Sequence, residues 1–133
     1  MPDGPDEFVE DVIRADGRYP LEAFAFLHEG LERAVKEAHT GSGKMPEPGS
    51  RHVTGRQMCI AIRDLAIERW GMLAPTVLAK WNIHATIDFG EMVYLEIEHK
   101  FMFKTEEDSI EDFRDVYDFA EAFRDVDTFE IRP

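Results

Sequence analysis

Residue types that bind metals or transfer protons are present in this chain of 133 residues, but their spacing forms no motif. The five histidines include no H-x-x-x-H pair, which would place two imidazoles on one helix face: His28, His39, His52, His84 and His99. The acidic run Glu106-Glu107-Asp108 lacks the glycine and the ligand spacing of a calcium loop. We therefore predict no metal, no cofactor and no catalytic residues, and we expect that the protein is not an enzyme.

His28 and Cys59 are expected to have structural roles. His28 lies within an apolar helical stripe, so we predict an imidazole at the edge of the core that one hydrogen bond satisfies. Cys59 is the only cysteine and follows Met58 in an apolar run, so we predict a small buried hydrophobe. One thiol cannot form an internal disulfide, and no signal peptide or membrane-spanning run is recognisable. These features predict a cytoplasmic protein.

The basic side chains are unevenly spread in a chain with a net charge of −13. Residues 51–85 hold five basic and two acidic side chains, so the middle of the chain is a basic island. Its members are candidate contacts for an anion or a nucleic acid: Arg51, Arg56, Arg63, Arg69 and Lys80. The acidic flanks would repel a polyanion, so we favour ion pairs within the fold over nucleic-acid binding.

Aromatic residues provide the candidate partner surface. Phe26 lies off the stripe formed by Leu21, Phe24 and His28, which predicts that its helix is buried on two sides. Together with Trp70 and Trp81 it is a candidate for contact with a protein partner or with a second copy of the chain.

The elements that must position these side chains are mainly helices. A short helix is predicted from Phe8 to Gly17, and Pro20 begins a longer one that continues to Ala38. Residues 40–52, rich in glycine and proline, predict a flexible loop. The chain is short enough for one domain, comprising N-terminal helices in 1–39, the loop, and a core with an acidic end in 53–133.

The core segment begins with the clearest local signal in the chain. Thr54 and Gln57 form a capping box, which predicts a helix to about Trp70 that Gly71 ends. A shorter helix is predicted from Pro75 to about Trp81. A further helix is expected to start at Asp88, with Asp88 and Glu91 as its cap, and to continue to Phe101.

The end of the chain permits two interpretations. Residues 101–117 fit a β-hairpin, because apolar residues flank a polar turn, but Phe113, Val116 and Tyr117 also fit helical periodicity. A last short helix is predicted near 118–124 with Asp118 as its cap, followed by an edge strand that includes Phe129 and Ile131.

The order of helices with a possible hairpin resembles a winged helix-turn-helix. The run Val77-Leu78-Ala79-Lys80-Trp81-Asn82-Ile83 is similar to the end of the second helix of such domains, although Trp81 and Asn82 replace the usual Leu and Gly. This resemblance implies an α+β fold that is mainly α, with a winged-helix-like three-helix core.

Short blocks along most of the chain resemble a small uncharacterised family associated with planctomycete and verrucomicrobial bacteria. The blocks are Tyr19-Pro20-Leu21-Glu22-Ala23-Phe24, His52-Val53-Thr54-Gly55-Arg56, Trp81-Asn82-Ile83, Asp88-Phe89-Gly90-Glu91, Lys104-Thr105-Glu106-Glu107-Asp108 and Asp112-Phe113. The resemblance implies a bacterial cytoplasmic protein without a known activity.

Two function classes follow from the sequence. The helix after the turn would read a DNA groove, but it contains Asp88, Glu91, Glu96 and Glu98, which repel phosphate. We therefore predict a non-enzymatic protein-interaction or adaptor module, and a homodimer is one form that this module could take. A nucleic-acid-associated regulator that uses residues 51–85 is the alternative.

Overall fold

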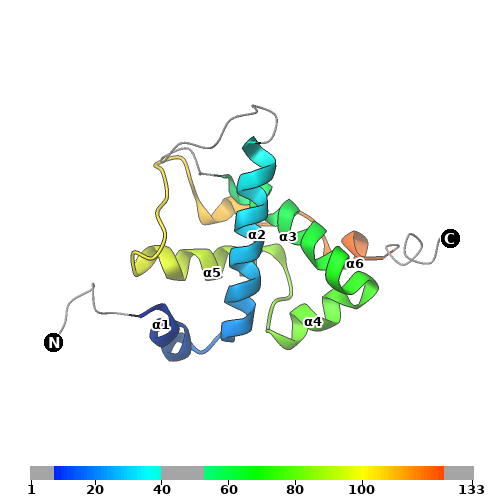
Figure 1. Cartoon of the computed structure of the whole chain (residues 1–133), viewed down its shortest axis with the longest axis horizontal. Helices are drawn as coiled ribbons and strands as arrows, with labels where there is room; N and C mark the ends of the chain where they lie inside the picture. The colour runs from blue at the N-terminus through cyan, green and yellow to red at the C-terminus, as the bar shows by residue number, and fades with distance from the viewer. Residues whose placement is uncertain (1–7, 40–52, 125–133) are drawn as a thin grey trace.

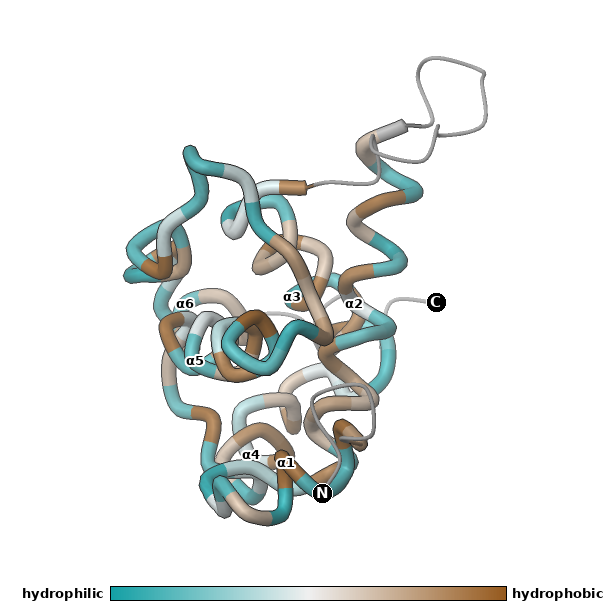
Figure 2. The backbone as a smooth tube through the Cα atoms, turned by 90° about the vertical axis from the view of Figure 1, so that its left-hand side faces the viewer, coloured by the Kyte–Doolittle hydropathy of each residue, from teal (hydrophilic) through white to brown (hydrophobic). Residues whose placement is uncertain are grey.

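The computed structural model describes residues 8–39 and 53–124, and the regular elements within these ranges are all helical. In chain order they are α1 (Val9–Asp16), α2 (Leu21–His39), α3 (Gly55–Trp70), the 3-10 helix η3 (Gly71–Leu73), α4 (Ala74–Lys80), α5 (Thr86–Glu98), the 3-10 helix η4 (Ile110–Phe113) and α6 (Phe119–Ala122). In the view of Figure 1, α2 crosses the centre, with the labels of α1 and α5 to its left and those of α3, α4 and α6 to its right, while Figure 2 shows that α2 lies at one edge of the molecule. The prediction of a mainly α fold is confirmed.

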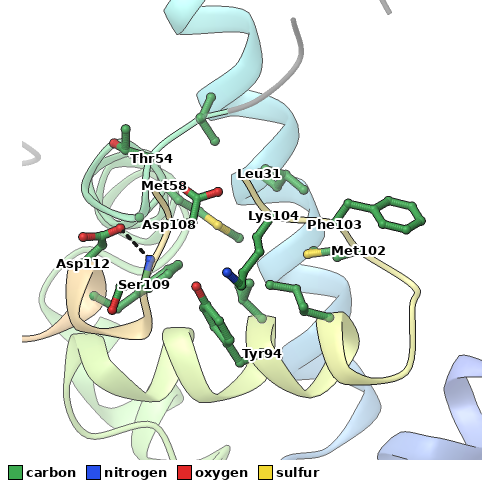
Figure 3. A pocket seen from close by; sticks show the side chains of 15 residues that line it. Leu31, Thr54, Met58, Tyr94, Met102, Phe103, Lys104, Asp108, Ser109 and Asp112 are labelled. Atoms are coloured by element: carbon green, nitrogen blue, oxygen red, sulfur yellow. Dashed lines mark hydrogen bonds between the residues drawn. The ribbon is translucent and has the colours of Figure 1, made fainter. Parts of the chain in front are cut away.

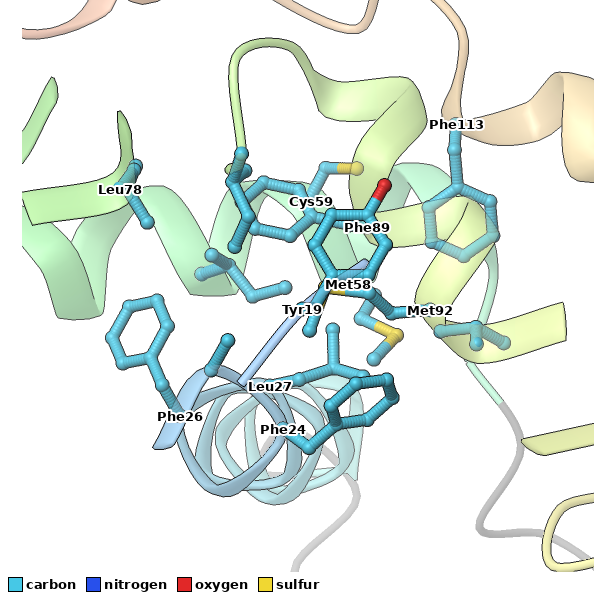
Figure 4. Close-up of a cluster of buried hydrophobic side chains, with 14 of the residues drawn as sticks. Tyr19, Phe24, Phe26, Leu27, Met58, Cys59, Leu78, Phe89, Met92 and Phe113 are labelled. Atoms are coloured by element: carbon cyan, nitrogen blue, oxygen red, sulfur yellow. The ribbon is translucent and has the colours of Figure 1, made fainter. Parts of the chain in front are cut away.

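Helix α2 buries one broad face that includes Phe26, and its opposite face, with Glu22, Ala25, Glu29 and Glu32, is exposed, so the predicted burial on two sides is wrong. Phe24 and Phe26 are each 2% exposed, and Leu27 is fully buried. Figure 4 shows Phe24 and Phe26 leaving the helix on either side of Leu27, and all three belong to one apolar core. Its largest interface is with α3. The exposed end of α2 projects beyond the other helices (Figure 2).

Local capping signals place several helix ends where the sequence predicts them. Gly17 ends α1 with φ of 80°, a conformation that is far less costly for glycine than for other residues. The N–H of Gln57 donates to Thr54 Oγ1 at 3.0 Å, while Gln57 Oε1 accepts from the Thr54 N–H at 2.8 Å, which completes the capping box of α3. Asp118 caps α6 by accepting the N–H of Glu121 at 3.1 Å.

Helix α5 differs from its predicted bounds at both ends. It starts at Thr86, and Asp88 lies inside its first turn, where the carboxylate accepts the N–H groups of His84 at 2.8 Å and Ala85 at 3.1 Å. The predicted cap at Asp88 is therefore wrong, because this carboxylate stabilises the helix start from the third helical position. The helix ends at Glu98 rather than Phe101, since Lys100 adopts φ of 68°.

Residues 101–117 form neither a β-hairpin nor a continuous helix, so the wing expected from the winged-helix resemblance is wrong. Asp108 accepts the N–H of Thr105 at 2.8 Å, and Asp112 accepts that of Ser109 at 3.1 Å. Side-chain carboxylates thus take N–H groups that a strand ladder would use. Asp115, with φ of 53°, then separates η4 from α6 and interrupts the helical period.

Two glycines allow η4 to pack closely against the helical core. A Cβ atom on Gly55 of α3 or on Gly90 of α5 would lie 2.9 Å from Phe113, whose side chain is 5% exposed. Thr86 Oγ1 donates to the Phe113 carbonyl at 2.6 Å and accepts the Val116 N–H at 3.1 Å. The close approach of Phe113 to α3 and α5 therefore depends on glycine at both positions.

Some predictions fall outside the described residues. They are the flexible loop 40–52, which includes Arg51, and the edge strand with Phe129 and Ile131. Within the described ranges, no helix combines the length and the apolar character that crossing a bilayer requires.

Candidate functional site

The three aromatic residues singled out in the sequence lie together in the structure. The ring of Phe26 from α2 is 5.0 Å from that of Trp70 at the end of α3 and 5.7 Å from that of Trp81, which follows α4. The two indoles are 5.7 Å apart in an edge-to-face arrangement. Phe26 is buried, whereas both indoles are partly exposed. We call this group, with its exposed neighbours Met72, Leu73 and Lys80, the aromatic face.

The local sequence explains why two indoles eleven positions apart meet. Gly71, with φ of 55°, ends α3, and η3 turns the chain into α4. After Lys80, Asn82 adopts φ of 67°, while the N–H of Ile83 donates to the Leu78 carbonyl at 2.9 Å. This is a Schellman motif in which asparagine takes the left-handed position usual for glycine. It fixes Trp81 at the end of α4, against Trp70.

Apolar side chains beside the indoles remain accessible to a partner. Leu73 is 65% exposed and Met72 is 48% exposed. Leu73, Val77 and Trp81 follow one another at intervals of four along α4, so they lie on one side of that helix. An apolar row next to partly exposed tryptophans is the composition that protein interfaces favour at their centre.

Cations surround the aromatic face, although the chain as a whole is acidic. The Arg69 guanidinium lies 5.8 Å from the Phe26 ring centre and forms an ion pair with Glu29. A hollow of about 400 Å³ between the ends of α1 and α4 is lined by Arg14, Arg18, Lys80 and Trp81, among others. Arg18 is paired with Asp16 at 3.0 Å and with Glu91 at 3.1 Å.

Lys80 and Arg14 are the cations of this hollow that stay available for a partner. Neither forms an ion pair within residues 8–39 and 53–124, and both are exposed. Their charges therefore face solvent beside Trp81.

The members of the basic island that the structure describes, Arg56, Arg63, Arg69 and Lys80, do not form one surface. Arg63 pairs with Asp64 at 3.0 Å and lies 6.0 Å from the Tyr117 ring, while Arg69 pairs with Glu29 on α2. Arg56 lines a hollow with the carboxylates of Glu106, Glu107, Asp108 and Asp112. Since Arg56 and Arg69 lie near opposite ends of α3 and acidic side chains accompany them, the structure does not gather the candidate phosphate contacts.

His28 lies at the edge of the core, as predicted, and its partner is a buried carboxylate that the sequence did not reveal. Its Nε2 lies 2.8 and 2.9 Å from the two carboxylate oxygens of Glu96, whose side chain is 2% exposed. The hydrogen bond to Glu96 raises the pKa of His28 above its usual value, against the opposing effect of burial. No spacing rule joins these positions on α2 and α5, so only the fold identifies the pair.

The raised pKa of His28 predicts a pH-dependent stability. A histidine pKa raised by folding stabilises the protein fully below the unfolded value of about 6.5, and this stabilisation disappears as pH rises through the folded pKa. We expect the free energy of unfolding to fall across that window in wild type, and His28→Gln to reduce the fall. Urea denaturation at several pH values measures it; equal pH profiles for the two proteins would contradict the assignment.

A second concave region lies between α2, α3, α5 and the loop before η4, at residues that the sequence analysis did not select. The cavity measures about 380 Å³, and its lining includes Met58, Tyr94, Met102, Lys104 and Asp112. Figure 3 shows Lys104 reaching back into this cavity beside Tyr94. The cavity depends on the path of residues 101–109. Because the sequence of this segment has no regular periodicity, the sequence gives no signal for the cavity.

The described residues hold no group of three or more histidine, cysteine, aspartate or glutamate side chains placed to bind a metal ion. Cys59 is fully buried, as predicted, and burial raises the pKa of its thiol to about 12. The Tyr117 hydroxyl donates to the Cys59 carbonyl at 2.8 Å. These groups support the fold, and the features suited to binding are the aromatic face and the cavity.

Comparison with known proteins found no matching family model, no significantly similar curated sequence and no significantly similar solved structure. The resemblance to a bacterial family stays a prediction.

Proposed function

We propose that this protein is a non-enzymatic interaction module that binds a protein partner through the aromatic face. The observation that carries the proposal is the packing of Phe26, Trp70 and Trp81 within 5.0 to 5.7 Å of one another, beside an exposed Leu73. Rigid tryptophans lose little conformational entropy on binding, and they contribute strongly to interface energies.

The charges beside this face select the chemistry of the partner. Lys80 and Arg14 are exposed cations without an ion pair among the described residues, in a chain whose net charge is −13. A segment that places apolar side chains next to carboxylates would bury Leu73 and pair with Lys80. The partner is therefore an acidic, amphipathic protein segment. A basic segment would find a complementary, negative potential only on other surfaces of the molecule.

The cytoplasmic location belongs to this proposal, because the only cysteine, Cys59, is a buried free thiol. A homodimer would place Lys80 and Arg14 of two copies near each other, which like-charge repulsion disfavours. Analytical ultracentrifugation distinguishes a homodimer from a protein that binds a different partner. Self-association through this face would give a dimer that Leu73→Ser dissociates.

Selection from a displayed library of random peptides tests the proposal. We expect the enriched peptides to combine carboxylates with aromatic or branched apolar residues. Leu73→Ser should weaken a selected peptide about tenfold, in the range typical of interface anchors. Lys80→Glu should weaken it and reduce its dependence on salt. Both substitutions are at exposed positions, so the fold is expected to persist.

Phe103→Ser is the matched control, because Phe103 is an equally apolar exposed residue, 83% accessible, that lines the other cavity. It should leave the affinity of the selected peptides unchanged. Enrichment of basic peptides, or binding that Leu73→Ser leaves intact, would refute the proposed face.

A further inference from the structure

The cavity of about 380 Å³ has the size and lining of a small-molecule site, and it is separate from the aromatic face. Its walls come from α2, α3, α5 and residues 101–113, and they are mostly apolar: Leu31, Val53, Met58, Val93, Ile97, Met102, Phe103 and Phe113. Of these, Phe103 is 83% exposed. Exposure of a large aromatic ring at the rim costs free energy that an apolar ligand in contact with it would recover.

The polar part of the lining is predominantly acidic. Asp108 and Asp112 line the cavity, and the adjoining hollow adds Glu106 and Glu107 against Arg56. Each of the two aspartates uses Oδ2 for a backbone N–H, at 2.8 Å from Thr105 and 3.1 Å from Ser109. These bonds hold both carboxylates at the lining of the cavity.

Tyr94 lies between the apolar walls and this acidic rim. Burial, followed by the charges of Asp108 and Asp112, raises the pKa of its hydroxyl. The ring of Tyr94 also offers a face to a cation. The potential at this end of the cavity is therefore negative.

Lys104 supplies the only ammonium group among the lining residues. Its Nζ donates to the Thr105 carbonyl at 3.4 Å, a long and weak hydrogen bond. Figure 3 shows the end of this side chain beside Tyr94. Because Lys104 is exposed and weakly held, it is able to swing away and leave the position to another cation.

We propose that this cavity binds a cationic amphiphile, a molecule with an apolar chain or ring system and a primary amine. The apolar part contacts Met58, Val93 and Met102, and the ammonium takes the position of the Lys104 Nζ beside Tyr94, in a cavity that Asp108 and Asp112 also line. The net charge of the chain, −13, further favours a cation over an anion. This ligand is independent of the protein partner of the aromatic face.

Titration with octylamine, octanol and octanoate tests the proposal, because the three probes share one tail and differ in the charge of the head. Binding is followed by NMR of ¹³C-labelled methionine methyl groups in the full chain. Met58 and Met102 line the cavity, whereas Met72 lies on the aromatic face and serves as the internal control. We expect octylamine to shift Met58 and Met102 with Kd on the order of 0.1–1 mM, and octanoate to bind at least tenfold more weakly.

Two substitutions of charged lining residues test the role of charge. Lys104→Met removes the competing ammonium and keeps an apolar side chain, so octylamine should bind several-fold more tightly, about fivefold for one nearby like charge. Asp112→Asn keeps an acceptor for the Ser109 N–H and should weaken octylamine by a similar factor. Equal affinity for the three probes, tighter binding of octanoate, or unchanged Met58 and Met102 signals would each overturn the proposal. None of these outcomes bears on peptide binding at the aromatic face.

Discussion

Gly30→Ala is expected to lower the free energy of unfolding by about 2 kcal/mol, although alanine is the better helix former by about 1 kcal/mol. Gly30 is buried in the middle of α2, and a Cβ atom there would overlap the Ile62 Cγ1 of α3. The helices must separate or Ile62 must leave its packed position. Urea denaturation of the two proteins measures the difference.

A double-mutant cycle identifies the cause. Ile62→Ala destabilises the protein by itself, because Ile62 is fully buried, but it removes the atom that the new Cβ would meet. In that background Gly30→Ala should cost little or become stabilising. An unchanged cost in the Ile62→Ala background would show that the close approach of α2 to α3 is not the reason.

Phe113→Ala is expected to cost about 3–5 kcal/mol, the range for a buried phenylalanine. Its ring is 5% exposed and rests on Gly55 and Gly90, so its loss would leave η4 without its main apolar contact. Residues 108–112, which include both aspartates of the cavity, would then lose their anchor. Chemical denaturation gives the stability, and a cost below about 1 kcal/mol would contradict this packing.

Gly90→Ala is the matched test of the same contact. In wild type its Cβ would lie 2.9 Å from Phe113, so we expect destabilisation despite the gain in helix propensity. The Phe113→Ala background removes the contact with Cγ, but the Cβ of residue 113 at 2.9 Å and the Ile110 Cγ1 at 3.1 Å remain, so the same substitution should still destabilise the protein, by a smaller amount. An equal cost in the two backgrounds would show that the Phe113 ring is not the obstacle.

The sequence predicts the local parts of the fold well. The capping box of Thr54 and Gln57, the glycine at position 17 and the cap at Asp118 are signals read within a few residues, and the structure confirms each. It also predicts that Phe26 lies off the stripe of α2 and belongs with Trp70 and Trp81 to one candidate partner surface. Short-range capping and helical periodicity suffice for these features.

The features that the sequence does not predict depend on distant contacts. The hairpin interpretation of residues 101–117 was wrong because Asp108 and Asp112 accept nearby N–H groups, and because Phe113 finds glycines on α3 and α5. Glu96 follows the same helical period as Phe89, Met92 and Val93, which indicates a buried position, but nothing in the sequence links it to His28. The cavity around Tyr94 joins residues from separate helices, and no short motif describes it.

The most direct test of the proposed function uses the indole N–H signals of Trp70 and Trp81, the only two tryptophans in the chain. A ¹⁵N spectrum of the full chain is recorded during titration with the tightest selected acidic peptide. We expect both indole signals to shift in wild type at peptide concentrations that leave the signals of Leu73→Ser unchanged. Indole signals that stay in place while the peptide binds would contradict the aromatic face as the binding site.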